Sequence, residues 1–174
     1  MTIFIAGVHG VGKSYLCQKY AVEYGVVHGS ASELIRKERA LADWTNDKKV
    51  ASIDDNQIAL KSAVMRINGV ENTLLLDGHF VLINSQSDFV ALESNVFDGL
   101  GLTGVILIEA ETNLIASRLA TRDSEKSAVN LIKFIRMERD TARAVCTSLS
   151  VPLIILHEPS FKEFSDAVRN LIDH

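Results

Sequence analysis

Residues 7–14 have the spacing of a phosphate-binding turn, because they match the pattern G-x-x-x-x-G-K-[ST]. Glycines let the backbone turn tightly, so that consecutive N–H groups point into one hollow that accepts an anion. The lysine supplies positive charge for the β- and γ-phosphates of a nucleotide, and the serine hydroxyl is a ligand for Mg²⁺. The pattern predicts a site for ATP and Mg²⁺, although a glycine-rich turn with an incidental lysine would share the spacing.

We call residues 7–14 the phosphate loop. The helix expected to follow it adds the positive end of its dipole to the same hollow. The residues predicted to bind the nucleotide are Gly7, His9, Gly10, Val11, Gly12, Lys13, Ser14 and Tyr15.

A second candidate element is Asp77, which ends the apolar run Leu74-Leu75-Leu76. Ligands bind at the carboxyl ends of strands in open α/β sheets, so this carboxylate is expected to hold Mg²⁺ through water. The alternative is that Asp77 only caps the turn with Gly78. His79 either orients a phosphate, a water or Asp77, or is a structural hydrogen-bonding residue; the sequence leaves both open.

Positive charge around a transferred phosphoryl group is expected from arginines. Arg118 and Arg122 lie four residues apart at the end of a predicted helix, so their side chains share one side. They are predicted catalytic residues, together with Lys13, Asp77 and His79, and a short lid is expected at about 118–126. A further stripe on the next helix is either functional or a solvated face with pairs to Glu138 and Asp140: Arg136, Arg139 and Arg143.

Arg36 lies on a helix predicted after the second strand, where it would face the phosphate loop across a cleft. It either holds the phosphate of an acceptor molecule or is an ordinary surface arginine. The acceptor-binding region is expected at about residues 30–67.

These residues need a scaffold of strands alternating with helices. Apolar runs at 2–6, 26–28, 72–77, 104–109 and 151–156 predict strands, and helical patterns lie between them. Capping boxes at 30–33 and 54–57 predict two helix starts. A loop or hairpin is expected at 78–87, a weak helix at 89–100, and a long helix at 127–148. The alternation predicts one α/β domain over residues 1–174, with a mostly parallel sheet covered on both faces.

Composition narrows the function classes. The chain has 174 residues, of which 47% are hydrophobic and 23% charged, so it is suited to a folded core rather than disorder. Its net charge of −4 argues against an extended nucleic-acid surface. Cys17 and Cys146 form no disulfide framework or zinc ligand set. No apolar run is long enough to span a membrane and no targeting signal is visible, so a cytoplasmic protein is expected.

The chain resembles the P-loop nucleoside monophosphate kinases, and within them the atypical adenylate kinases of archaea and of the eukaryotic nucleus. The resemblance extends from Thr2 to about Ile172. It depends on the phosphate loop, on Asp77-Gly78-His79, and on residues 111–114 leading to Arg118-Leu119-Ala120-Thr121-Arg122-Asp123.

The resemblance implies a three-layer P-loop fold with a five-stranded parallel sheet of order 2-3-1-4-5. It implies transfer of phosphate from Mg-ATP to a nucleoside monophosphate, with Asp77 and His79 as a Walker B-like element, Arg118 and Arg122 as lid arginines and Arg36 on the acceptor phosphate. The chain departs from typical adenylate kinases at residues 77–81, where Asp-Gly-His-Phe-Val replaces Asp-Gly-Phe-Pro-Arg. It also has His157-Glu158-Pro159 after the last strand, without the glycine that often backs the adenine ring.

Two other functions fit the same motifs. One is a P-loop ATPase that drives a protein or ribonucleoprotein partner, with water as the acceptor. The other is a kinase for a nucleoside or another small alcohol, which would need a carboxylate base near the acceptor hydroxyl. Asp77 is the candidate for that base. The sequence leaves the acceptor base open, and it leaves room for a homo-oligomer or a protein partner.

Overall fold

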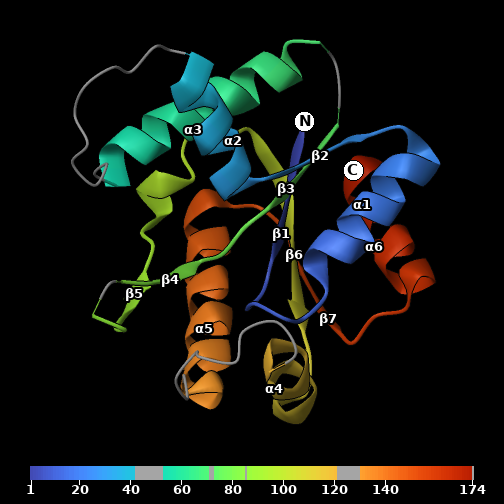
Figure 1. Ribbon diagram of the computed structural model, residues 1–174. Helices are drawn as coiled ribbons and strands as arrows, with labels where there is room; N and C mark the ends of the chain where they lie inside the picture. The colour runs from blue at the N-terminus through green and yellow to red at the C-terminus, as the bar shows by residue number, and fades with distance from the viewer. Residues whose placement is uncertain (42–52, 71–72, 85, 121–129, 174) are drawn as a thin grey trace.

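The computed structural model describes residues 1–41, 53–70, 73–84, 86–120 and 130–173. Figure 1 shows the arrangement of the helices and strands. In chain order they are β1 (Thr2–Ala6), α1 (Lys13–Tyr24), β2 (Val27–Ser30), α2 (Ala31–Leu41), α3 (Ile53–Asn68), β3 (Leu74–Asp77), β4 (Val81–Ile83), β5 (Phe89–Ala91), the 3₁₀ turn η1 (Ser94–Val96), β6 (Leu102–Glu109), α4 (Thr112–Ala120), α5 (Leu131–Leu149), β7 (Leu153–His157) and α6 (Phe161–Asp173).

Five strands form one parallel sheet in the order β2-β3-β1-β6-β7. This confirms the expected α/β class with a five-stranded parallel sheet. The expected numbering 2-3-1-4-5 differs in detail, because β4 and β5 pair as a separate antiparallel hairpin between the third and fourth strands of the sheet. The sheet places the carboxyl ends of β1 and β3 side by side, with Ile5 in register with Asp77.

Helices cover both faces of the sheet (Figure 1). Successive side chains of a strand point to opposite faces. In β1, Ile3 and Ile5 belong to the core cluster under α1 and α6, whereas Phe4 and Ala6 belong to the cluster under α3 and α5. All four are buried, so the strand has no solvent-facing side and reads as a continuous apolar run.

The start of α2 agrees with its sequence signal, because the Ser30 hydroxyl accepts a hydrogen bond from the Glu33 N–H at 3.2 Å. The second capping prediction is wrong. Helix α3 begins at Ile53, so Asp54 already lies within the helix and is not the residue that precedes it.

The helix expected at 89–100 is also wrong. Phe89–Ala91 pairs with Val81–Ile83 as a strand, and only the short turn Ser94–Val96 is helical. Aromatic and β-branched residues favour strands, and the Phe89 ring stacks on Phe134 of α5 at 5.0 Å. Because the local helical pattern was weak, packing against α5, which is distant in the sequence, determined that this segment forms a strand.

Helix α5 begins at Leu131, and the Asn130 side chain caps it by accepting from the Lys133 N–H at 3.0 Å. Its inner face carries Phe134, Ala142 and Val145, with Glu138 buried among them.

None of the helices in the described part of the chain combines the length and the apolar character that a membrane span requires.

Candidate active site

The phosphate loop joins β1 to α1 and takes its shape from glycines with positive φ. Gly7 has φ of 139°, and a Cβ there would collide with the carbonyl oxygen of Ile108. Gly12 precedes α1 in the left-handed region, with φ of 104°. Only glycine adopts these conformations without strain at such close approach. The motif glycines are therefore needed to bring the backbone over the end of the sheet.

Lys13 lies back over this loop. Its ammonium donates to the carbonyl oxygens of Gly7 at 2.6 Å and Val8 at 3.3 Å, and lies 3.9 Å from the Asp77 carboxylate. Burial lowers the pKa of Lys13, and the negative charges of Asp77 and Glu138 oppose that shift. The site thus holds a cation directly beside the hollow of the loop.

Ser14 and Asp77 meet at the adjacent ends of α1 and β3. The Ser14 hydroxyl donates to Asp77 Oδ2 at 2.5 Å, and His28 Nε2 of β2 lies 3.9 Å from the same oxygen. Burial raises the pKa of Asp77, but His28, Lys13 and Ser14 outweigh it, so the net shift is downward. A hydroxyl and an ionised carboxylate are oxygen ligands that suit Mg²⁺, so this pair fits that ion.

His79 packs against the phosphate loop. Its ring lies 4.2 Å from the ring of His9. Its buried Nδ1 lies 3.9 Å from Glu138 and has no hydrogen-bond partner among the described residues. Burial, followed by the charges of Lys13 and His9, lowers the pKa of His79 to about 3. The imidazole is neutral at pH 7, and its part in catalysis stays a prediction.

Arg118, in the last turn of α4, reaches the loop and donates to the Gly10 carbonyl at 2.9 Å. It lines a cleft of about 440 Å³ together with the exposed Tyr15. The other residues around this cleft are His9, Gly10, Gly12, Lys13 and Ser14. Most of the predicted nucleotide-binding residues therefore surround one cleft.

Two of the predicted nucleotide-binding residues face elsewhere. Val11 is 5% exposed and belongs to the core cluster, and Gly7 lines a small cavity behind the loop. Both residues therefore face the interior: the Gly7 N–H donates to Glu138 at 3.2 Å, and the Val11 side chain packs in the core.

The remaining arginines have separate positions. Arg36 lies on the exposed surface of α2. Arg136 pairs with Asp140 at 3.6 Å in solvent, and Arg143 is exposed. Arg139 pairs with Glu109 of β6. Arg122 and residues 121–126 of the expected lid lie outside the described residues, as does the 42–52 part of the acceptor region.

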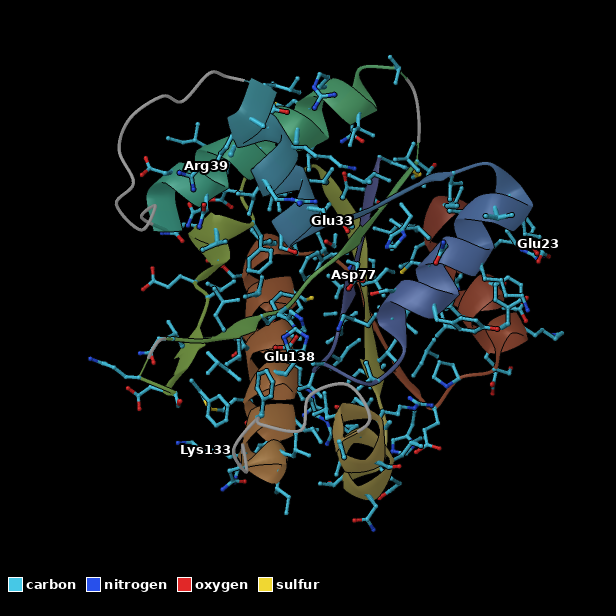
Figure 2. The ribbon with its side chains drawn as sticks, viewed as in Figure 1. Glu23, Glu33, Arg39, Asp77, Lys133 and Glu138 are labelled. Carbon is cyan, nitrogen blue, oxygen red and sulfur yellow. The ribbon has the colours of Figure 1, made fainter. Side chains whose placement is uncertain are left out.

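Sequence reasoning missed Glu138, which is 1% exposed in the middle of α5. Figure 2 shows it on the side of α5 that faces the sheet, and Asp77 between the central strands and α1. Glu138 accepts from the N–H groups of Gly7 (3.2 Å), Phe80 (3.0 and 3.1 Å) and Val81 (2.8 Å). The available signal was its position four residues from both Phe134 and Ala142, within the apolar stripe of the helix.

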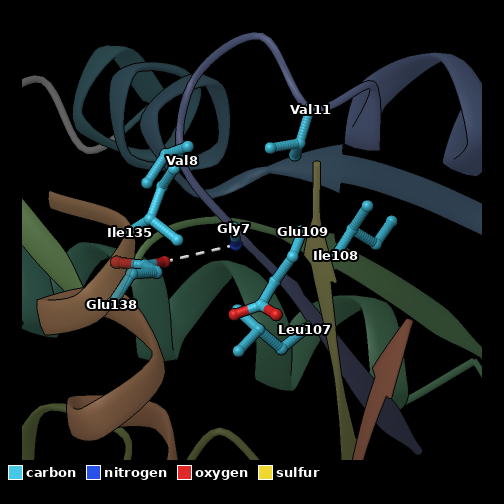
Figure 3. A pocket seen from close by; sticks show the side chains of 8 residues that line it. All are labelled: Gly7, Val8, Val11, Leu107, Ile108, Glu109, Ile135 and Glu138. Atoms are coloured by element: carbon cyan, nitrogen blue, oxygen red, sulfur yellow. Dashed lines mark hydrogen bonds between the residues drawn. The ribbon is translucent and has the colours of Figure 1, made fainter. Parts of the chain in front are cut away.

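Glu109 was missed too. It ends β6 and makes a two-pronged pair with Arg139, at 2.6 Å to Nε and 2.5 Å to Nη2. Figure 3 shows Glu109 and Glu138 on the wall of the small cavity behind the phosphate loop, with the bond from Glu138 to Gly7 drawn as a dashed line.

Several known proteins are similar to this chain in sequence or in fold. Residues 6–135 match the family model described as AAA domain. Among curated proteins, the chain is 27% identical over 130 residues to an adenylate kinase of Kosmotoga olearia and 29% identical over 133 residues to one of Streptococcus uberis. Each match covers 70% of this chain and spans 59% or 60% of the relative. A UMP-CMP kinase of Xenopus tropicalis is 31% identical over 80 residues, 44% of this chain and 41% of the relative.

Two solved structures share the fold along nearly the whole chain. A sugar kinase from Janibacter sp. HTCC2649 has a TM-score of 0.58 at 16% identity, over 99% of this chain and 94% of that one. The shikimate kinase of Aquifex aeolicus has a TM-score of 0.58 at 12% identity, over 98% and 97%. At these identities the likeness shows the fold alone.

The relatives support the nucleoside monophosphate kinases and do not support the atypical archaeal and nuclear type that the sequence motifs suggested. The family match covers the phosphate loop, the strand that ends in Asp77, and the arginine of α4. On that match, together with the geometry of the loop, the chain belongs to the P-loop family described as AAA domain.

Proposed function

We propose that the protein is a phosphotransferase that moves the γ-phosphoryl group of Mg-ATP to a nucleoside monophosphate. One observation carries the proposal. Lys13 and the Ser14–Asp77 pair lie together beside the phosphate loop, at the carboxyl ends of β1 and β3. This arrangement offers a cation for phosphates and oxygen ligands for Mg²⁺ beside one cleft, which Lys13 and Ser14 line.

The proposal assigns each group of the site a role in binding phosphate, neutralising charge or holding Mg²⁺. The loop backbone N–H groups and the start of α1 bind phosphate oxygens, and Lys13 and Arg118 neutralise charge on the transferred group. Arg122 is proposed for the same task. Ser14 is a ligand of Mg²⁺ and Asp77 holds the ion through water. Such a site acts by positioning and electrostatics rather than by covalent chemistry.

A phosphate acceptor fits the site better than an alcohol. An alcohol needs a base, and the candidate carboxylate, Asp77, is already engaged by the Ser14 hydroxyl at 2.5 Å. A nucleoside monophosphate is largely ionised at pH 7 and attacks without that help. The names of the curated relatives support the same acceptor class. Arg36, exposed on α2, is proposed to bind the acceptor phosphate.

A small-molecule kinase is the second candidate, and the fold shared with a sugar kinase and a shikimate kinase favours it. An acceptor panel separates the candidates. Purified protein is incubated with Mg-ATP and, separately, with each nucleoside and deoxynucleoside monophosphate, nucleosides, hexoses, shikimate, and no acceptor. The ATP consumed and the phosphorylated product formed are both measured.

The proposal expects at least one monophosphate to raise ATP consumption about tenfold or more over the rate with water, with one acceptor molecule converted to its diphosphate for each ATP consumed. Stimulation by an alcohol alone would replace it with the small-molecule kinase. Failure of every acceptor, with a steady rate in water, would replace it with the ATPase.

A further inference from the structure

A buried carboxylate connects two loops of the site. Glu138 is 1% exposed, and its two oxygens accept from three backbone N–H groups. One of these, Gly7, opens the phosphate loop. The other two, Phe80 and Val81, follow Asp77 by three and four residues. A single side chain of α5 thus holds the phosphate loop against the loop that carries the proposed metal-binding carboxylate.

Burying the Glu138 carboxylate costs free energy. The group loses the solvation it had in water, and that loss is offset only where hydrogen bonds or a paired charge replace the water. Among the described residues, its only ion-pairing neighbour within 4.0 Å is His79, whose Nδ1 lies 3.9 Å away, beyond hydrogen-bond distance. Glu138 is therefore held chiefly by the N–H groups of the two loops.

The contacts of Gly7 show how the carboxylate acts on the site. The N–H of Gly7 donates to Glu138, and the carbonyl of the same residue accepts from the Lys13 ammonium at 2.6 Å. Turning the Gly7 backbone would displace the oxygen on which Lys13 rests. The position of the Lys13 charge therefore depends on Glu138 through one residue.

We infer that Glu138 is a positioning residue, which fixes the phosphate loop and the loop after Asp77 in the conformation that binds the triphosphate of ATP. The inference rests on the proposed function, because it takes the cleft beside Lys13 to be the ATP site. Glu138 itself lies on the inner side of the loop and acts through Gly7 rather than on the substrate.

The chain offers a matched control in Glu109. This second buried carboxylate is 6% exposed and lines the same small cavity as Glu138 (Figure 3). Its oxygens bind the guanidinium of Arg139, also on α5, so it too docks that helix on the sheet. None of the hydrogen bonds described for it reaches the phosphate loop. Glu138→Gln and Glu109→Gln are therefore the same chemical change at one helix–sheet contact, with and without the link to Gly7.

The experiment measures two quantities on both variants and the wild type, after circular dichroism confirms folding. Amide hydrogen exchange by NMR is followed at Gly7, Phe80 and Val81, and the dissociation constant of Mg-ATP is measured by calorimetry. In Glu138→Gln, an amide N–H₂ group faces N–H donors that the carboxylate accepted. Exchange at these three amides should accelerate, and ATP affinity should fall, each by about tenfold or more. Glu109→Gln should leave both within about twofold of the wild type.

A folded Glu138→Gln variant that binds Mg-ATP as the wild type does would overturn the inference. An equal loss in Glu109→Gln would also overturn it, since the effect would then come from helix docking. If Glu138→Gln does not fold, Glu138→Asp keeps the charge with a shorter reach and should show the same direction. Fast exchange at Gly7 in the wild type would overturn the inference without any variant. A wild type that binds no Mg-ATP would instead overturn the proposed function, and the exchange rates would still decide whether Glu138 holds the loop.

Discussion

At the scale of single residues, Lys13 is held by the loop that it serves. Two carbonyl oxygens of that loop fix its ammonium, and Asp77 lies 3.9 Å away to balance the charge. The side chain is 6% exposed, so little rotamer freedom remains to be lost when an anion binds. The cation is therefore preorganised beside the hollow that the glycines form.

Replacing this cation should remove most of the activity. Lys13→Ala is expected to lower kcat/KM for ATP by about 100-fold or more, because a preorganised charge in a partly buried site stabilises the transferring group strongly. Steady-state rates of ADP formation check this. Lys19→Ala is the control, because Lys19 is exposed on the same helix and lies over the Phe161 ring at 4.2 Å. A Lys13→Ala variant with wild-type turnover would contradict the assignment of the phosphate loop.

At the scale of elements, helices α2 and α3 pack against each other and against strands β2 and β3. The Glu38 carboxylate of α2 ties them, with Arg66 at 2.6 Å and the Ser62 hydroxyl at 2.7 Å from α3. That pair occupies most of the described part of the region expected to bind the acceptor. Arg36 lies on the exposed surface of this unit, where it is proposed to bind the acceptor phosphate.

Arg36→Ala should therefore act on the acceptor and not on ATP. The KM of the nucleoside monophosphate is expected to rise about tenfold, because a charge-assisted hydrogen bond to phosphate is lost, with the KM of ATP within about twofold. Initial rates with each substrate varied in turn measure both constants. The neighbouring exposed lysine provides the control, as Lys37→Ala. Equal changes in both KM values would place Arg36 outside the acceptor site.

A buried thiol on helix α5 should make the free energy of unfolding depend on pH. Cys146 is 4% exposed on its inner face, and burial raises the pKa of its thiol to about 11. The unfolded chain loses this proton near the ordinary value of 9.0, so between about pH 9 and 11 it binds fewer protons than the folded chain. The free energy of unfolding must then fall as pH rises through that window.

For Cys146 this loss is about 2 kcal/mol between pH 8 and 10.5. Urea unfolding at both values should show a steeper decline for the wild type than for Cys146→Ala, which has no proton to lose. Comparing the declines rather than the absolute stabilities removes the cost of the small cavity that the alanine creates. Parallel declines would mean that the thiol is accessible in the folded protein and that α5 packs less closely than described.

At the scale of the whole molecule, the fold and the part of the candidate site formed by the phosphate loop and Asp77 could be predicted from the sequence. Alternating apolar runs and amphipathic stretches predicted the parallel sheet with helices on both faces, since each signal is local and strong. The phosphate loop was predicted for the same reason: its chemistry is written in eight consecutive residues. Asp77 followed from the rule that ligands bind where parallel strands end.

What could not be predicted depends on partners far apart in the chain. The segment Phe89–Ala91 became a strand through the hairpin with β4 and the stack on Phe134, 45 residues farther along the numbering. Glu138 meets Gly7 across 131 residues, and Arg139 meets Glu109 across 30. In the sequence, a glutamate followed by an arginine within a helix is typical of a solvent-exposed face. The burial of Glu138 becomes apparent only when the packing of α5 on the sheet is known.

The central claim is that the γ-phosphoryl group leaves ATP for a nucleotide and not for water. The most direct measurement uses ATP labelled at its γ-phosphorus, incubated with Mg²⁺, the protein and the best monophosphate of the acceptor panel, with products separated by chromatography. Asp77→Asn serves as the reference, because it keeps the shape of the side chain and removes the charge beside Ser14.

The account predicts that the label appears in the nucleoside diphosphate, in an amount equal to the ATP consumed. It also predicts that transfer falls by about 100-fold or more in Asp77→Asn, because the carboxylate proposed to hold Mg²⁺ is gone. Label recovered only as inorganic phosphate, at a rate that the monophosphate does not change, would contradict the account.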